Sequence, residues 1–329
     1  MIRCILDAFA NTMKRILVPL ILLSSIAAAA PPQRPSLAWR QADSSLALLN
    51  GDHVVWQFNY GKDLEKVHFH PLSLLDGTVL TALGPRDHRW HHALWFSWKE
   101  LNHVNYWDRA GNPKVAGRTD VVTARVVPHR DHSARIEMTF SYHPDDGAPV
   151  LRETRTIVVH RPAKDGTYRI DWTGVFTAGD QPVILKGGIS EGGYAGMSVR
   201  IAQSTDQWRL VDSEGREDTP GGRSAKNTHG QRSRWADFSM VDKATGHTGG
   251  IAILENPASF RHPSQWHNII NDKVPFGYFS PATLWSEPYT LPAGKTLTVY
   301  YRVLVHPGRA DKPAIEREWK QFSRQHPGS

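Results

Sequence analysis

The fold is decided by two neighbouring stretches, Leu151-Arg-Glu-Thr-Arg-Thr-Ile-Val-Val-His160 and Tyr168-Arg-Ile-Asp-Trp-Thr-Gly-Val-Phe-Thr-Ala178. Apolar and polar residues alternate along both, and Val, Ile and aromatic residues are frequent, as in half-buried strands. An Asp-Gly pair at Asp165 lies between them and is typical of a turn. The two stretches therefore predict two strands joined by a short connection.

The same alternation recurs along most of the chain. In the first half it marks Leu37–Leu48, Asp52–Tyr60, Val121–Val127 and Ala134–Tyr142. In the second half it marks Val183–Gly188, Ala195–Ala202, Arg234–Asp242, Thr248–Glu255, Gly277–Phe279 and Lys295–His306. Many strands with short turns predict an all-β protein, a large antiparallel β-sandwich.

Helical spacing is found only near the end of the chain. Ala314, Ile315, Trp319 and Phe322 recur at that spacing within 312–325, which predicts a short amphipathic C-terminal α-helix packed on the sheets. A polar stretch from Asp212 to Arg232 is too long for an ordinary loop and suggests either a lid or a disordered excursion. No shift in composition separates two domains, so residues 37–329 are expected to form one β-rich domain.

The N-terminus has the pattern of a secretory signal. Met13 is followed by Lys14-Arg15, an apolar run and small residues, which predicts a signal peptide over residues 1–29. Met13 is also a better start than Met1, and residues 30–36 look like a flexible entry. The apolar run is shorter than a membrane span needs. A periplasmic or secreted protein is therefore expected, with no membrane segment after cleavage.

Cysteine and charge narrow the range of functions. The only cysteine is Cys4, inside the expected signal, so the mature chain has no disulfide, thiol nucleophile or thiolate metal site. The net charge of +7 comes from interleaved residues of both signs. No dense basic stripe suggests nucleic acid as a partner. The sequence leaves the oligomeric state open.

Chemistry is concentrated between Gly84 and Trp98, in Gly-Pro-Arg-Asp-His-Arg-Trp-His-His-Ala-Leu-Trp-Phe-Ser-Trp. Histidine near neutral pH acts as base, acid or metal ligand. The carboxylate of Asp87 beside an imidazole fixes its tautomer. Neighbouring imidazoles split their pKa values, so one can be base and another acid. The candidate catalytic residues here are Asp87, His88, His91 and His92. The competing interpretation is an aromatic core whose imidazoles bind backbone carbonyls.

Histidines at His68 and His70 share one face if that segment is a strand, because side chains alternate with period 2. Zinc and copper sites use such pairs, and His91 is a candidate third ligand. The same rings could instead bind sugar hydroxyls. No cofactor is expected, and a divalent metal is left open as the alternative.

Two other places attract attention. Glu191 opens a glycine-rich turn where backbone amides can approach a ligand, and it is a further candidate catalytic carboxylate. The segment from Ser259 to His267 combines polar and aromatic residues in what looks like a Pro-punctuated loop, and such loops often bind ligands. The candidate substrate-binding residues across the chain are His68, His70, Trp95, Trp107, Tyr194, Arg200, Arg261, His262, Trp266 and His267.

Several motifs together carry a family resemblance. They are Phe69-His-Pro-Leu, Asp87-His-x-x-His-His-x-Leu-Trp-Phe-x-Trp98, Gly192-Gly-Tyr-x-Gly-Met-Ser-Val-Arg200, Trp235-x-Asp-Phe-Ser239 and Arg261-His-Pro-Ser-x-Trp266. This order resembles a bacterial family of unknown function commonly labelled methane oxygenase PmoA, over nearly the whole mature chain. The chain also looks similar to the mutarotase-like supersandwich. That resemblance implies a carbohydrate ligand and catalysis by His with Glu or Asp on a concave sheet.

Residues and resemblance together predict an exported carbohydrate-active protein. The leading hypothesis is an enzyme that acts on a sugar or oligosaccharide by acid–base chemistry, as an epimerase, a lyase or a glycoside-cleaving enzyme. A metal-dependent oxygenase or hydrolase and a non-catalytic sugar-binding module are the alternatives. The histidines are expected to converge with Glu191 or the Arg261–His267 segment on one face, because scattered buried imidazoles would each need a partner.

Overall fold

The computed structural model describes residues 36–108, 117–145, 147–188, 193, 195–221, 226–309 and 311–325. The expected signal peptide, the alternative start at Met13 and residues 30–35 lie outside this part, as do Glu191 and Tyr194. The described residues belong to one compact unit. None of the described helices is long and apolar enough to cross a membrane.

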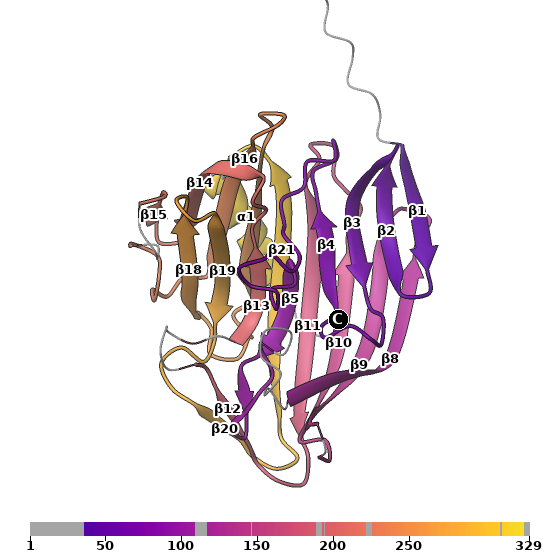
Figure 1. Cartoon of the computed structure of the whole chain (residues 1–329), viewed down its shortest axis with the longest axis vertical. Coiled ribbons are helices and arrows are strands. Elements are labelled where there is room, and N and C mark those ends of the chain that lie inside the picture. Colours follow the sequence, from indigo (N-terminus) through magenta and orange to yellow (C-terminus); the bar gives the residue numbers. More distant parts are fainter. Residues whose placement is uncertain are drawn as a thin grey trace, which may run out of the picture. The chain divides into compact units, whose positions relative to one another are not determined.

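Two large antiparallel sheets and one small sheet make up the fold (Figure 1). The eight-stranded sheet has the order β1 (Leu37–Ala42), β2 (Ser45–Asn50), β3 (His53–Asn59), β4 (His68–Leu72), β5 (Leu94–Trp98), β13 (Ala195–Arg200), β19 (Phe276–Ala282) and β18 (Gln265–Asn271). The nine-stranded sheet has the order β15 (Glu217–Asp218), β14 (Thr205–Asp212), β16 (Trp235–Asp242), β17 (Thr248–Glu255), β21 (Thr296–Pro307), β11 (Tyr168–Ala178), β10 (Leu151–Val159), β9 (Ala134–Pro144) and β8 (Gly117–Pro128). The four-stranded sheet has the order β20 (Tyr289–Leu291), β12 (Val183–Lys186), β6 (Glu100–Leu101) and β7 (Val104–Asn105).

Alternation gives each large sheet an inner and an outer face. Phe96 on β5 points inward, and its ring lies 5.2 Å from that of Phe176 on β11 in the facing sheet. The next side chain along β5, Trp95, therefore points to the outer face. His68 on β4 is the register partner of Trp95 and lies on the same outer face. The outer face of the eight-stranded sheet is thus where the aromatic and imidazole side chains gather.

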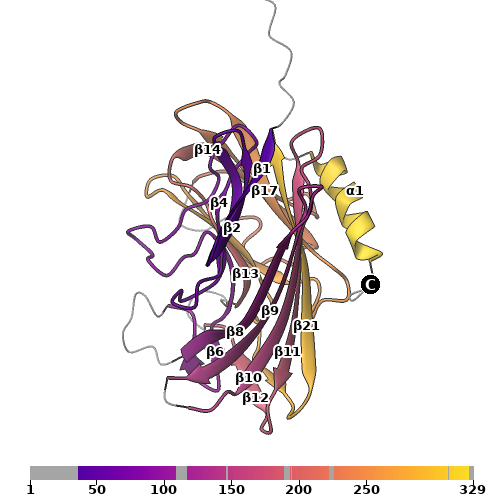
Figure 2. The same cartoon turned by 90° about the vertical axis from the view of Figure 1, so that its right-hand side faces the viewer.

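Among the described residues there is one helix, α1 (Lys312–Ser323), which lies on the outer side of the nine-stranded sheet, away from β2 and β4 (Figure 2). Its N-cap is Asp311, whose carboxylate accepts from the backbone of Ala314, as expected for a helix start. Ile315 and Phe322 are its buried residues, and the indole of Trp319 donates to the Glu255 carbonyl at 2.8 Å. The predicted all-β sandwich with a short C-terminal helix is confirmed.

Three local predictions were wrong. The stretch Leu37–Leu48 is not one strand but a hairpin of β1 and β2, which turns at Asp43-Ser44 without a glycine to mark it. The polar stretch after Asp212 is not structureless: it contains β15, and the Asp218 carboxylate accepts from two backbone amides, those of Asn227 and Thr228. The third error concerns the end of the 259–267 segment, because Gln265 begins β18.

Candidate functional site

The outer face of the eight-stranded sheet presents an aromatic cluster that is separate from the core. It contains Trp95, Trp107 and Tyr278, with Trp90, Ile269 and Phe276 packed against them. Strand pairing aligns these side chains, since Trp95 is opposite Ser198 on β13, and Tyr278 on β19 is opposite Ile269 on β18. The cluster therefore comes from strands that are distant in sequence and adjacent in the sheet.

Two consecutive turns bring the histidines over this face. The His88 amide donates to the Pro85 carbonyl at 2.9 Å, and the His91 amide donates to the His88 carbonyl at 3.0 Å. The loop closes where the Gly84 amide donates to the His91 carbonyl at 2.8 Å. As a result the rings of His88 and His91 lie side by side, with centroids 4.7 Å apart.

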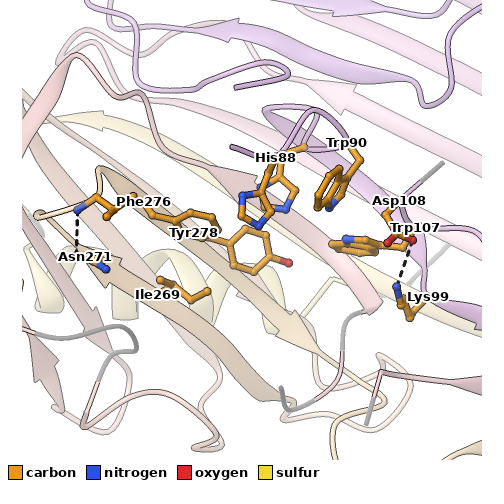
Figure 3. Close-up of a pocket in the computed structure, with 11 residues that line it drawn as sticks. His88, Trp90, Lys99, Trp107, Asp108, Ile269, Asn271, Phe276 and Tyr278 are labelled. Atoms are coloured by element: carbon orange, nitrogen blue, oxygen red, sulfur yellow. Dashed lines mark hydrogen bonds and ion pairs between the residues drawn. The ribbon is translucent and has the colours of Figure 1, made fainter. Parts of the chain in front are cut away.

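These groups line a cleft of about 340 Å³ (Figure 3). Its lining residues are His88, Trp90, His91, Lys99, Trp107, Asp108, Ile269, Asn271, Val274, Phe276 and Tyr278. Figure 3 shows the imidazole of His88 near Trp90 and Tyr278, and the Lys99–Asp108 pair beside Trp107. The cleft thus combines flat apolar surfaces with a few polar groups, which is the usual composition of a small-molecule site.

Asp87 fixes the orientation of His88. Its carboxylate lies 3.0 Å from His88 Nδ1 and also accepts from Arg200 Nη2 at 2.6 Å. Burial tends to raise the Asp87 pKa, but the charge of Arg200 and the hydrogen bond from His88 outweigh it, so the pKa is lowered. An ionised Asp87 accepts a hydrogen bond from His88 Nδ1–H, which keeps the proton on Nδ1 and leaves Nε2 as the basic atom.

Arg200 is the buried ion-pair partner of the Asp87 carboxylate. Its side chain is fully buried on β13, and the guanidinium carbon lies 3.7 Å from the centre of the Phe276 ring. The predicted substrate contact of Arg200 is therefore not what the geometry favours. Arg200 is placed under the cleft wall, where it positions Asp87 and through it His88.

His91 is a buried neutral imidazole. Its ring packs 5.2 Å from Trp95 and 5.3 Å from Tyr278, between centroids. Burial, and next the nearby charge of His88, lower its pKa well below the ordinary value. Its Nδ1 has no hydrogen-bond partner among the described residues. His91 is therefore uncharged at neutral pH and has a lone pair or an N–H available for a ligand.

A second histidine pair, His68 and His92, lies beside Trp95. The rings of His68 and His92 are 5.5 Å apart, and His68 Nδ1 donates to the Lys66 carbonyl at 2.9 Å. Burial lowers the His68 pKa to about 4. His92 Nε2 lies 3.8 Å from the Glu65 carboxylate, whose pKa is about 2 because His92 and Lys66 outweigh the effect of burial. Neither His68 nor His92 lines the cleft, and the pair instead packs beside Trp95.

A charged pair and a phenol also line the cleft. Lys99 Nζ lies 3.3 Å from Asp108 Oδ1. The Tyr278 hydroxyl lies 3.0 Å from Ser198 Oγ, and burial raises the Tyr278 pKa to about 12. Tyr278 thus remains a neutral hydrogen-bonding group, while Lys99 supplies positive charge to the same cleft.

The metal hypothesis finds no preformed site in the described ranges. No group of three or more His, Cys, Asp or Glu side chains in them is arranged to hold a metal ion. His68 Nδ1 is bonded to a carbonyl, and His70 Nδ1 lies 3.2 Å from Thr81 Oγ1. Of the candidate ligands His68, His70 and His91, the first two therefore already have protein partners for one nitrogen.

The 259–267 segment contributes to three places. His267 joins the outer face, with its ring 5.5 Å from Tyr278. Trp266 does not: it is fully buried in the main core, with its indole 2.9 Å from the Ser233 carbonyl, so the expectation that it lines the site was wrong. Arg261 and His262 line a different pocket. The alternation of β18 explains the split, since 266 and 267 point to opposite faces.

The sequence prediction missed one wall of the cleft. The missed lining residues are Lys99, Asp108, Ile269, Asn271, Val274, Phe276 and Tyr278. Most of them look like ordinary core or surface residues when each is considered alone. The alternation of Phe276, Tyr278 and Ser280 with Phe279 along β19 is a signal that could have assigned them to an outer face.

Comparison with solved structures gives distant likenesses. The chain is similar to a putative aldose 1-epimerase from Klebsiella pneumoniae subsp. pneumoniae, with 10% identity and a TM-score of 0.43 over 85% of this chain and 83% of that one. It is also similar to the GH36 alpha-galactosidase AgaA from Geobacillus stearothermophilus, with 13% identity and a TM-score of 0.36 over 83% of this chain and 40% of that one. A third similar structure is the Slr1438 protein from Synechocystis sp. PCC 6803, with 11% identity and a TM-score of 0.32 over 85% of this chain and 99% of that one. Likenesses of this strength carry no argument about activity.

A search of curated proteins gave no significant match. Residues 45–320 match a family model described as "Family of unknown function (DUF6807)". That description contains no activity, so the methane oxygenase label and the mutarotase-like expectation both stay predictions. Because the match covers most of the 329 residues, the chain belongs to the DUF6807 family of unknown function.

Proposed function

We propose that this protein is an exported carbohydrate-active enzyme that binds a sugar or oligosaccharide in the cleft on the outer face of the eight-stranded sheet. The supporting observation is the composition of the cleft: aromatic faces, two adjacent imidazoles and a charged pair line one space. Sugar rings present apolar C–H faces and polar edges. Trp90 and Trp107 match the faces, while imidazole, carboxylate and amide groups match the edges.

The acid–base machinery centres on His88. Asp87 holds Nδ1–H of His88, so Nε2 accepts a proton from the substrate. The resulting imidazolium is stabilised by the Asp87 carboxylate. His91, whose ring is 4.7 Å away, stays neutral because it is buried, and it can hydrogen-bond to a substrate hydroxyl. The His88 imidazolium is the group that gives the proton back, either to the substrate carbon or to a leaving group. A positioned group of this kind typically contributes about 10²–10⁴-fold in rate.

Lys99 makes proton abstraction beside a carbonyl or carboxyl group the favoured reaction. Its ammonium group, paired with Asp108, lines the same cleft as the imidazoles and can stabilise the negative charge that develops on a substrate oxygen. Epimerisation and β-elimination both begin with this step. Glycosidases usually pair two carboxylates across the bond, and Asp108 is the one carboxylate among the described lining residues. Glycoside cleavage is therefore less favoured.

Deuterium exchange tests this proposal. Purified protein is incubated in D₂O with a panel of plant and algal glycans, and products are followed by NMR and mass spectrometry. Epimerisation should introduce deuterium at the carbon that loses its proton, whereas β-elimination should give an unsaturated product. His88→Gln should slow either outcome about 10²–10⁴-fold. His129→Gln is the matched control, since His129 is exposed on a turn far from the cleft in sequence. Binding without any exchange or product would instead favour the non-catalytic sugar-binding module.

The alternative of a metal-dependent oxygenase or hydrolase is tested by metal analysis of the mature protein. Stoichiometric zinc, copper or iron that is lost in both His68→Ala and His91→Ala would contradict the metal-free mechanism. Metal contents that are substoichiometric and equal in wild type and both variants would agree with it.

A further inference from the structure

A second pocket, of about 250 Å³, lies where β18 begins. Its lining residues are Arg232, Arg261, His262, Gln265, Ala282, Thr283, Trp285, Ser286 and Glu287. Residues 230–231 run beside β18, because Gly230 N donates to the Trp266 carbonyl at 2.8 Å and Trp266 N donates to the Gln231 carbonyl at 3.1 Å. This pairing places Arg232 at the mouth of the pocket, which we call the arginine pocket.

One polar atom in the arginine pocket has no partner among the described residues. The hydroxyl of Thr283, a residue only 5% exposed, makes no hydrogen bond there, whereas His262 Nδ1 lies 3.8 Å from the buried Glu255 carboxylate. A buried polar atom without a partner costs about 1–3 kcal/mol. Pocket-lining atoms of this kind are available to a ligand that enters the pocket.

The charge of the arginine pocket is positive. Arg232 is exposed and donates to the Pro263 carbonyl at 2.7 Å. Arg261 is fixed in place, since it donates to the carbonyls of Glu287 and Pro288 at 2.8 and 3.0 Å. The Glu287 carboxylate lies 3.5 Å from Arg261 and offsets one of the two positive charges. The Glu255 carboxylate behind His262 is fully buried, and burial raises its pKa to about 7, so it is only partly charged at neutral pH. The positive charge that remains, beside a hydroxyl group and an indole, suits an anionic group on a sugar.

A continuous row of rings joins the arginine pocket to the cleft. Trp285 lies 5.9 Å from His267, and His267 lies 5.5 Å from Tyr278, between ring centroids. Gln265 and Ile269 are on the same face of β18, one in each cavity. Four strand residues at about 3.3 Å each separate them by roughly 13 Å. That span is longer than one sugar ring, so a ligand that reaches both cavities is an oligosaccharide.

We propose that the arginine pocket is a subsite for a sugar residue that carries a carboxylate or sulfate group, and that a neighbouring ring of the same oligosaccharide occupies the His88 cleft. Arg232 contacts the anionic group, and the Thr283 hydroxyl hydrogen-bonds to it or to an adjacent hydroxyl. The second half of this inference rests on the proposed function. The first half, binding of an anionic sugar by the arginine pocket, stands independently of it.

Titration with single sugars tests the arginine pocket. The probes are D-glucuronate, glucose 6-sulfate and neutral glucose, followed by ligand-observed NMR on the full-length mature protein. At least one charged sugar should bind about tenfold or more tightly than glucose, and the better of the two identifies the anion. Arg232→Gln and Thr283→Val should each weaken that binding by about fivefold or more. Arg125→Gln, at an exposed arginine on β8, should leave it unchanged.

Thr283→Val also separates a ligand contact from a structural role. The substitution keeps the shape of a side chain whose hydroxyl has no described partner, so stability should be unchanged or raised while binding falls. Charged sugars that bind no more tightly than glucose would overturn the inference. Equal binding by wild type and both pocket variants would overturn it too.

An oligosaccharide tests the link between the two cavities. Trigalacturonate should be bound less tightly by both Arg232→Gln and Trp90→Ala, while glucuronate should be affected by Arg232→Gln alone. Loss in only one variant would refute the bridging ligand. If glucuronate binding depends on Arg232 but no glycan exchanges deuterium, the proposed reaction is overturned and the anionic subsite is retained.

Discussion

Replacement of Asp87 by Asn separates the stabilising and catalytic roles of one carboxylate. Asp87 is the ionic partner of Arg200, whose side chain is fully buried. Loss of one partner of a buried ion pair costs about 3–5 kcal/mol. The Asp87 side chain is 27% exposed, so water compensates in part and we expect a loss of about 2–3 kcal/mol. The same change releases the His88 tautomer, and turnover should fall by about 10²–10⁴-fold.

The stability change is measured by urea unfolding, followed through tryptophan fluorescence. Glu137→Gln is the control, because Glu137 pairs with exposed arginines and should change the unfolding free energy by no more than about 1 kcal/mol. The double variant Asp87→Asn/Arg200→Met removes the unpaired charge as well. It should recover most of the lost stability but none of the activity. Full activity in Asp87→Asn, or a double variant as unstable as the single one, would refute this assignment of roles.

Three further predictions concern pH and substrate binding. Burial raises the Glu255 pKa to about 7, so this group stabilises the fold below pH 4.5 and the contribution is lost as pH rises through 7. Glu255→Gln should remove that decline and raise the unfolding free energy at pH 8 by on the order of 1–3 kcal/mol, as measured by urea titration at several pH values. His306 is buried, which lowers its pKa, but Asp237 outweighs this and raises the pKa above the ordinary 6.5. His306→Gln should therefore reduce the loss of stability as pH rises above 6.5. Thermal melts at several pH values test this, and a melting temperature that falls with pH as steeply in the variant as in the wild type would contradict it. Trp90→Ala should raise KM for the sugar by about tenfold with a smaller effect on kcat, and steady-state kinetics would show the reverse if Trp90 served only the chemical step.

Strands with strict alternation were predictable from the sequence. β11 and β17 have the predicted bounds, 168–178 and 248–255. Every second residue of β11 is buried, and nearly all residues of β17 are buried, so both strands show a regular pattern in the sequence. β18 was missed because Pro263 and Ser264 precede it and most of its residues are polar or aromatic, with only Ile269 and Ile270 aliphatic. Its strand character comes from pairing with β19, a non-local contact that no local pattern reports.

The imidazole side of the cleft was predictable, and the opposite side was not. His88 and His91 stand out because clustered histidines have few purely structural roles. Tyr278 and Ile269 do not stand out, since the sequence cannot tell that their faces of β19 and β18 point away from the core. The expectation that Trp266 lines the site failed for the same reason. A one-residue difference on a strand decides between the core and the site.

The most direct test of the proposed sugar site is a crystal structure of the protein with the carbohydrate that gives the strongest deuterium exchange. The proposal predicts a sugar ring packed against Trp90 or Trp107, with the reacting atom about 3 Å from His88 Nε2. A sugar bound on another surface, with the cleft between His88 and Lys99 empty, would contradict it.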